Sequence, residues 1–213
     1  TDPGLKGAFN VKSEEYFFGN EVFTVRNIDK KAEAQGIIFY PQLNSLKKDQ
    51  TLPVVLMMHG KFDTCYRNDD GDVALEFGWP CRRGFKSAPY YLGFNYLAEH
   101  LASQGFFVVS VSANAINAND DQTFDDGARS RSDLIDAHLS MWRNYNNKGE
   151  GRLAGNVAAQ LVGKLDFNRL GLLGHSRGGD AVVQFLRFNN AKQSGKFSVK
   201  AVMPVAPKYT TPF

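Results

Sequence analysis

The chain has 213 residues, 43% of them hydrophobic and 13% aromatic, and its formal net charge at pH 7 is +3. This length and composition fit one globular domain with a substantial core, and the nearly balanced charge argues against nucleic-acid binding. Because no run of about 18 apolar residues is present, we expect no segment that spans a membrane.

The first third of the chain is predicted to be mainly β-structure. Residues 21–25 alternate between polar and apolar side chains, which predicts a half-buried strand. Gln35–Pro41 is apolar and β-branched and ends at a proline, which predicts a second strand. Leu52–Met58 is continuously apolar up to His59 and Gly60, a pattern typical of a central strand that is buried on both faces.

Two cysteines, Cys65 and Cys81, bracket a polar segment that is rich in turn-forming residues. A disulfide between them would close a loop of 17 residues and stabilise the fold by about 3 kcal/mol. The length of this loop and its lack of core-forming residues favour the disulfide, and with it a secreted or cell-surface protein. The alternative is a pair of unpaired thiols in a cytosolic protein.

The middle of the chain alternates between helical and strand patterns. Residues 94–101 carry apolar side chains at helical spacing, and residues 106–112 predict another buried strand. A long helix is expected from about Asp126, and Val199–Val205 is expected to be the last strand. Strands that alternate with helices indicate βαβ units and a parallel sheet, with the antiparallel N-terminal strands at one edge.

The most informative stretch is a G-x-S-x-G motif followed by a further glycine: Gly174, His175, Ser176, Arg177, Gly178 and Gly179. An apolar run precedes the motif and apolar residues at helical spacing follow it. This pattern predicts a nucleophile elbow, in which the serine lies on a sharp strand-to-helix turn and the glycines avoid clashes of Cβ atoms. Ser176 is the expected nucleophile, and the alternative is a glycine-rich turn with a purely structural role.

A second motif follows the predicted strand Leu52–Met58. In the architecture that carries a nucleophile elbow, the loop at this position supplies one backbone N–H of the oxyanion hole, and the residue after the serine supplies the other. The expected donors are therefore the amide of Lys61 or Phe62 and the amide of Arg177. Such donors typically contribute about 3–4 kcal/mol to stabilisation of the transition state. The N-terminus of the following helix favours negative charge at the same place.

None of the four histidines is a convincing catalytic base. His175 directly precedes Ser176, so its side chain is expected to point away from the serine hydroxyl. His59 lies on the oxyanion turn and is expected to have a structural hydrogen-bonding role. His138 falls on the apolar face of the long helix, and His100 flanks another amphipathic stripe.

The sequence also gives no evidence for a metal or a cofactor, and we expect neither. No His/Cys cluster has the spacing of metal ligands. Residues 68–72 resemble a cation-binding loop in composition only. Four further aspartates are expected to be turn and helix-capping residues: Asp120, Asp121, Asp125 and Asp126.

With both motifs in place, the chain resembles the α/β-hydrolase superfamily. Residues 174–179 are similar to the elbow of chlorophyllase-like, secreted acetylhydrolase and cutinase-like esterases. Blocks at residues 64–66, 79–81, 96–98, 101–105 and 109–118 resemble a group of secreted bacterial hydrolases. The resemblance implies an α/β-hydrolase fold, with a mostly parallel sheet and helices on both faces. It also implies Ser176 as the nucleophile, paired cysteines, and a catalytic acid and histidine further along the chain.

The end of the chain departs from this pattern. Enzymes of this fold carry their acid and histidine after the serine, but residues 181–213 contain five basic residues and no Asp, Glu or His. Residues 1–213 are therefore expected to be the N-terminal two-thirds of a single α/β-hydrolase domain. A C-terminal continuation or a second chain would supply the remaining strands and the triad.

The expected function is that of a secreted serine hydrolase, carboxylesterase-like or lipase-like, that cleaves an ester substrate through an acyl-enzyme on Ser176. This chain alone is expected to be inactive. Two alternatives remain: a non-catalytic binding or surface-assembly module that keeps the elbow as architecture, and a part of a larger multidomain protein.

Overall fold

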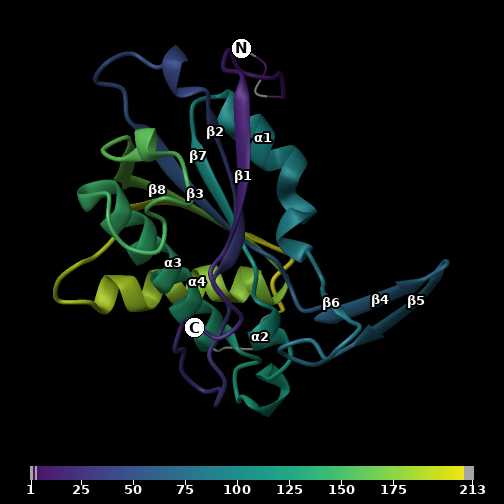
Figure 1. The fold of residues 1–213 in the computed structure, drawn as a ribbon. Helices are drawn as coiled ribbons and strands as arrows, with labels where there is room; N and C mark the ends of the chain where they lie inside the picture. The colour runs from purple at the N-terminus through teal and green to yellow at the C-terminus, as the bar shows by residue number, and fades with distance from the viewer. Residues whose placement is uncertain (1, 3, 209–213) are drawn as a thin grey trace.

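A six-stranded sheet forms the centre of the protein in a computed structural model that describes residue 2 and residues 4–208 (Figure 1). The β2 strand runs antiparallel to both of its neighbours, and the last four strands in the spatial order run parallel to one another. The predicted α/β class with a mostly parallel sheet is thereby confirmed. The spatial order of the strands is β1 (Val11–Phe17), β2 (Gln35–Pro41), β7 (Phe107–Val111), β3 (Leu52–Met58), β8 (Leu165–His175) and β9 (Val199–Val205).

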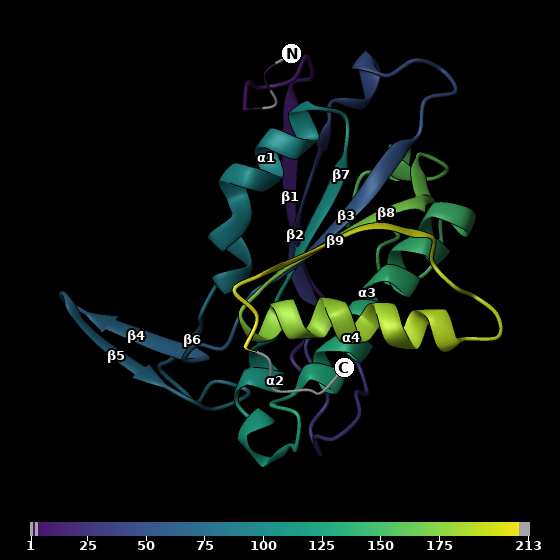
Figure 2. The same ribbon diagram turned by 180° about the vertical axis from the view of Figure 1, so that it is seen from behind.

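Helices lie on both faces of this sheet (Figures 1 and 2). On one face α1 (Asn95–Ser103) packs into a buried cluster that contains Met57 of β3. On the other face α3 (Ala128–Lys148) and α4 (Arg177–Ala191) pack into a larger cluster that contains Leu56. Neighbouring residues of a strand point to opposite faces, so a strand in this position must be apolar throughout. This is why β3 could be predicted from its sequence with the correct bounds.

Several shorter elements complete the fold. The cysteine-bounded segment, which the sequence suggested was a polar loop, forms a hairpin that projects from the body of the protein (Figures 1 and 2). No helix in the described ranges combines the length and the apolar character that crossing a membrane requires. The shorter elements are β4 (Cys65–Asp69), β5 (Asp72–Glu76), β6 (Lys86–Ser87), α2 (Asn114–Asn117), and the 3-10 turns η1 (Leu43–Ser45), η2 (Tyr90–Phe94), η3 (Asp120–Gln122) and η4 (Ala159–Leu161).

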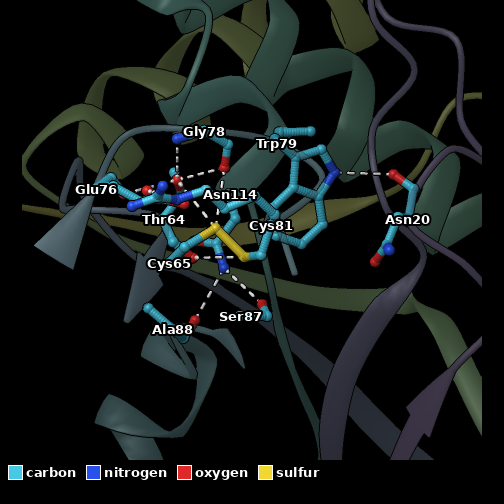
Figure 3. The surroundings of a disulfide bond; sticks show 12 residues. Asn20, Thr64, Cys65, Glu76, Gly78, Trp79, Cys81, Ser87, Ala88 and Asn114 are labelled. Atoms are coloured by element: carbon cyan, nitrogen blue, oxygen red, sulfur yellow. Dashed lines mark hydrogen bonds and ion pairs between the residues drawn. A yellow bond between two sulfur atoms is a disulfide. The ribbon is translucent and has the colours of Figure 1, made fainter. Parts of the chain in front are cut away.

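A disulfide joins Cys65 to Cys81 at the base of this hairpin, as the sequence predicts, with their Cα atoms 5.7 Å apart (Figure 3). The hydroxyl of Thr64 donates a hydrogen bond to the carbonyl of Gly78 at 2.7 Å. The indole N–H of the buried Trp79 donates to the carbonyl of Asn20 at 2.9 Å. The disulfide and the Thr64 hydrogen bond therefore close the base of the hairpin, and the Trp79 hydrogen bond joins it to the N-terminal part of the domain.

The strand predicted at residues 21–25 is wrong. This segment forms only an isolated bridge between Phe23 and Ala32, and the first strand is β1, which pairs antiparallel with β2. Only Tyr16 of β1 is buried, because a strand at the edge of a sheet needs little apolar surface. In residues 21–25 the alternation reflects side chains that pack from a loop, such as the buried Val25.

The opposite edge of the sheet is β9, where the sequence predicts a strand with the same bounds. The strand pairs in parallel with β8, and α4 packs against it. Met203 is 60% exposed and Val205 is 38% exposed, so apolar side chains of this edge strand face solvent.

Candidate active site

Ser176 lies at the point where β8 ends at His175 and α4 begins at Arg177. Its backbone has φ 53° and ψ −124°, a conformation that residues other than glycine rarely adopt. The N–H of Ser176 donates to the carbonyl of Val205 at 2.9 Å, and its carbonyl accepts from the N–H of Gly179 at 2.7 Å. The predicted strand–serine–helix turn is therefore present, and the backbone around the serine is held from both sides.

Three glycines allow the surrounding backbone to pack closely around this turn. A Cβ atom on Gly174 would lie 2.0 Å from the carbonyl oxygen of Gly178, and a Cβ on Gly178 would lie 2.4 Å from the carbonyl oxygen of Met58. A Cβ on Gly60 would lie 2.9 Å from the Cβ of Ser176. The loop after β3 and the elbow after β8 therefore touch at the carboxyl ends of two neighbouring parallel strands.

The backbone amides predicted to form the oxyanion hole lie on these two turns. Neither Lys61 nor Phe62 donates a backbone hydrogen bond to another described residue. Arg177 is the first residue of α4, so its N–H has no acceptor within the helix. The hydroxyl of Ser176 likewise forms no hydrogen bond with a described residue. Within the described part of the chain, these turns thus carry backbone donors and a serine hydroxyl that form no hydrogen bond.

His59 has the structural role that the sequence predicts. The side chain is buried; Nδ1 donates to the carbonyl of Gly60 at 2.7 Å, and Nε2 accepts from the N–H of Ala113 at 3.0 Å. Burial lowers the pKa of this imidazole to about 4, although the Gly60 carbonyl partly opposes the shift. Both ring nitrogens of His59 are occupied, and the ring is neutral at pH 7.

The other histidines are also not hydrogen-bonded to Ser176 among the described residues. His138 is buried in α3, where Nδ1 lies 2.9 Å from the hydroxyl of Tyr16, and burial lowers its pKa to about 3. The ring of His175 is stacked with the ring of Phe62 at 6.4 Å. His100 lies in the last turn of α1. No histidine described in the structure is positioned as the base for Ser176.

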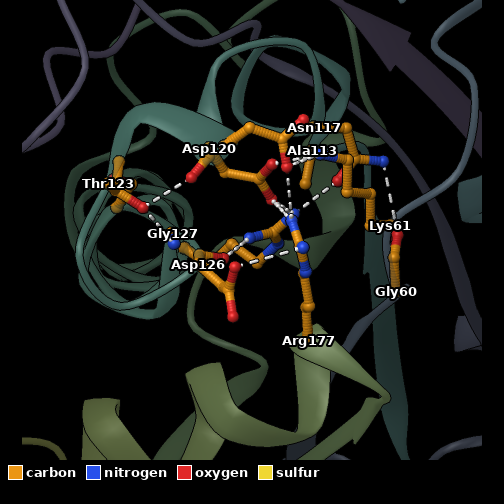
Figure 4. Close-up of polar contacts among 12 residues, drawn as sticks. Gly60, Lys61, Ala113, Asn117, Asp120, Thr123, Asp126, Gly127 and Arg177 are labelled. Carbon is orange, nitrogen blue, oxygen red and sulfur yellow. Dashed lines mark hydrogen bonds and ion pairs between the residues drawn. The ribbon is translucent and has the colours of Figure 1, made fainter. Parts of the chain in front are cut away.

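A buried cluster of charges, which was not predicted from the sequence, lies beside the two turns (Figure 4). The carboxylate of Asp120 binds the ammonium group of Lys61 at 2.7 Å, and it binds the guanidinium groups of Arg177 at 2.6 Å and Arg131 at 2.7 Å. Asp126 binds Arg177 at 3.2 Å. The side chains of Asp120 and Arg131 are fully buried.

The expectation that the aspartates of this segment serve as turn and capping residues holds only in part. Asp125 accepts a hydrogen bond at 3.2 Å from the N–H of Arg129, in the first turn of α3. Asp120 instead binds three cationic side chains. Burial opposes the ionisation of Asp120, but Arg131, Arg177 and Lys61 outweigh burial and hold its pKa below the usual value. A hint was present in the sequence, since a cationic residue follows the key residue in both motifs: Lys61 follows Gly60, and Arg177 follows Ser176.

The described residues include no group of three or more His, Cys, Asp or Glu side chains that could hold a metal ion. Residues 68–72, which resemble a cation loop in composition, form the tip of the β4–β5 hairpin. No protein-family model matches the chain, and a search of curated proteins found no match. The function is therefore inferred from the geometry of the site together with the motifs in the sequence.

Proposed function

We propose that the protein is a serine hydrolase of the α/β-hydrolase type, carboxylesterase-like or lipase-like, that cleaves ester bonds through an acyl-enzyme on Ser176. The observation that carries this proposal is the conformation of Ser176, with φ 53° at the turn between β8 and α4. Backbone strain of this kind costs about 1–3 kcal/mol and is concentrated at functional sites. The strain presents a hydroxyl with no structural partner among the described residues, which favours a chemical role for the side chain.

The reaction that fits this site is acyl transfer. The Ser176 hydroxyl oxygen attacks the ester carbonyl carbon and gives its proton to a histidine. The carbonyl oxygen becomes negatively charged and accepts hydrogen bonds from the amides of Arg177 and of Lys61 or Phe62. The alcohol leaves with the proton that the histidine returns, and water then hydrolyses the acyl-enzyme. The N-terminus of α4 adds a favourable field at the oxyanion.

The acid and the histidine would come from a C-terminal continuation or from a second chain. Residues 181–213 contain no Asp, Glu or His. Among the described strands β9 pairs only with β8, and its side chains Met203 and Val205 are exposed, a surface that favours the addition of another strand. Added strands would carry new side chains to the carboxyl ends of β3 and β8, where Ser176 lies. On this proposal residues 1–213 are the N-terminal two-thirds of the domain.

The proposed location is outside the cell or on its surface. The bond between Cys65 and Cys81 supports it, because disulfides persist mainly in oxidising compartments.

A non-catalytic binding or surface-assembly module is the second candidate, whether alone or within a larger multidomain protein. It is favoured by the contacts of two histidines: both ring nitrogens of His59 are occupied, and His138 is buried against Tyr16. The elbow would then be retained for its packing alone.

Labelling with a fluorophosphonate tests the proposal, because an activated serine forms an Ser–O–P bond and expels fluoride. The full-length protein should be labelled at Ser176, as located by peptide mass spectrometry, and Ser176→Ala should abolish the label. Ser140→Ala, a change in the middle of α3, should leave labelling unchanged. The 213-residue chain by itself should label poorly, since no described histidine activates the hydroxyl.

Intact mass spectrometry of the natural protein is the companion measurement. A soluble monomer of 23.7 kDa, with no associated fragment and no labelling at Ser176, would overturn the proposal in favour of the non-catalytic module.

A further inference from the structure

The two turns of the candidate active site are joined through the side chains of the residues that are expected to use only their main chains. Lys61 on the first turn and Arg177 on the second both bind the carboxylate of Asp120, at 2.7 Å and 2.6 Å. Asp120 belongs to neither turn, since it lies on η3 between α2 and α3. Both cationic side chains are mostly buried, with 15% and 11% of their surface exposed. These side chains are therefore engaged in holding the turns together (Figure 4).

A second set of contacts fixes the peptide group between Gly60 and Lys61. The carbonyl oxygen of Gly60 accepts hydrogen bonds from Nδ1 of His59 at 2.7 Å and from the amide of Asn117 at 3.3 Å. In a planar trans peptide the C=O and N–H groups point in opposite directions. The N–H of Lys61 therefore points away from His59 and Asn117, and its direction is fixed by the two hydrogen bonds of the Gly60 carbonyl.

Arg131 connects the two sets of contacts. One of its guanidinium nitrogens donates to the side-chain oxygen of Asn117 at 2.5 Å and lies 2.7 Å from Asp120. Asn117 holds the backbone of the first turn, and Asp120 holds the side chains of both turns. The fully buried ion pair between Arg131 and Asp120 therefore connects the contacts that hold the two turns.

We propose that Asp120 is a positioning residue of the active site: its carboxylate sets the distance between the Lys61 and Arg177 amides, so that both can donate to the same oxyanion. This inference rests on the proposed function of Ser176. It predicts a specific effect on the transition state, because the oxyanion forms only during the reaction. A purely structural ion cluster would instead affect stability and leave the rate per folded molecule unchanged.

The test compares two isosteric variants of buried aspartates on the same segment, Asp120→Asn and Asp125→Asn. Asp125 is also fully buried but pairs with Arg129, and among the described residues it forms no ion pair with Lys61 or Arg177. In the full-length protein acting on p-nitrophenyl acetate, Asp120→Asn should lower kcat about tenfold or more, since loss of a whole oxyanion donor costs about 10²–10³. The KM should change less than about twofold. Asp125→Asn should leave both constants near the wild-type values.

A double-mutant cycle distinguishes a positioning role of Asp120 from independent effects of the three side chains on kcat. Lys61→Met and Arg177→Met should each lower kcat in the wild-type background and have little further effect when Asp120 is already Asn. Equal effects in both backgrounds would overturn the inference, as would a kcat per folded Asp120→Asn molecule equal to that of the wild type.

An independent readout distinguishes a failure of this inference from a failure of the proposed function. In ¹⁵N-labelled full-length protein, Asp120→Asn should shift the amide resonances of both Lys61 and Arg177, whereas Asp125→Asn should shift neither. If both amides shift but the full-length protein is never labelled at Ser176, the proposed function fails and the structural coupling stands. If Ser176 is labelled but neither amide shifts, the positioning role of Asp120 is wrong.

Discussion

The two backbone turns that meet at the candidate active site are held by different forces. The elbow around Ser176 is fixed by close contact, because Gly174 and Gly178 leave no room for a Cβ atom. The turn at Gly60 is fixed by hydrogen bonds to its carbonyl and by the ion pair between Lys61 and Asp120. Steric contact is independent of charge, whereas the second arrangement depends on the ionisation states of Lys61 and Asp120. The two turns should therefore respond differently to substitution and to pH.

The largest effect is expected where the charges are concentrated. Asp120→Ala leaves the buried guanidinium of Arg131 without its counter-ion, and breaking such a pair typically costs about 3–5 kcal/mol. Urea unfolding should show this loss, and high salt should change it little because the site is buried. Asp69→Ala is the control, since it removes the carboxylate from an exposed pair with Arg67 and should cost about 1 kcal/mol or less. Equal losses for the two variants would contradict the prediction.

Substitution of a glycine in the elbow should destabilise the fold to a comparable extent, but only through steric clash. Gly174→Ala places a methyl group 2.0 Å from the carbonyl oxygen of Gly178 and should cost about 3 kcal/mol or more. Gly171→Ala on the same strand is the control, because its Cβ would meet Val55 at an ordinary 3.4 Å. The control should cost less than about 1 kcal/mol in the same unfolding assay. A Gly174→Ala protein as stable as the control would show that the elbow backbone can adjust.

Acid should weaken the hydrogen-bonded turn first. Burial lowers the pKa of His59 to about 4, below the value of about 6.5 in an unfolded chain. The unfolded chain therefore takes up a proton first as the pH falls. The contribution of His59 to the free energy of unfolding is fully present above about pH 6.5 and is lost progressively as the pH falls to about 4. About 2 kcal/mol of it is lost at pH 5. His138, with a pKa lowered to about 3, contributes in the same direction.

His59→Gln should reduce the loss of stability between pH 7 and pH 5 by about 2 kcal/mol, as measured by urea unfolding at both values. An NMR titration of the His59 ring in the wild type should have its midpoint near 4. A midpoint near 6.5 would contradict the neutral, structural role of this histidine.

The smallest predicted effect is a gain in stability. Ser176→Gly relieves the positive φ of the elbow and should stabilise the fold by about 1 kcal/mol, while removing the nucleophile. Ser140→Gly in the middle of α3 should instead cost about 0.5–1 kcal/mol. Opposite signs in thermal or urea unfolding would show that the elbow stores strain at the serine, and a loss in both variants would refute it.

The parts of the fold that sequence patterns located best are the strands that combine a continuous apolar run with a clear boundary. Gln35–Pro41, Leu52–Met58 and Val199–Val205 form strands with the expected bounds, and the cysteines are paired as expected. The patterns failed where a strand needs little burial. At the N-terminal edge β1 has one buried residue, and the polar β4 is stabilised by cross-strand pairing with β5.

The elbow was predictable because its physics is local: glycines and a serine at fixed spacing determine a turn wherever a strand leads into a helix. The sequence also identified His59 as structural, because it lies on the turn that follows the strand Leu52–Met58. The oxyanion amides and the catalytic role of Ser176 stay predictions, to be decided by the labelling experiment.

Only the tertiary structure decided how the two turns are held relative to each other. Asp120 lies 59 residues after Lys61 and is brought to Arg177 only when β3, η3 and α4 assemble. Charges interact according to their separation in space and to the burial of their surroundings, and neither quantity has a signature in sequence spacing. The sequence therefore determined the strands with clear apolar runs, the disulfide and the shape of the elbow, whereas folding determined that one buried carboxylate would bind a cationic side chain from each turn.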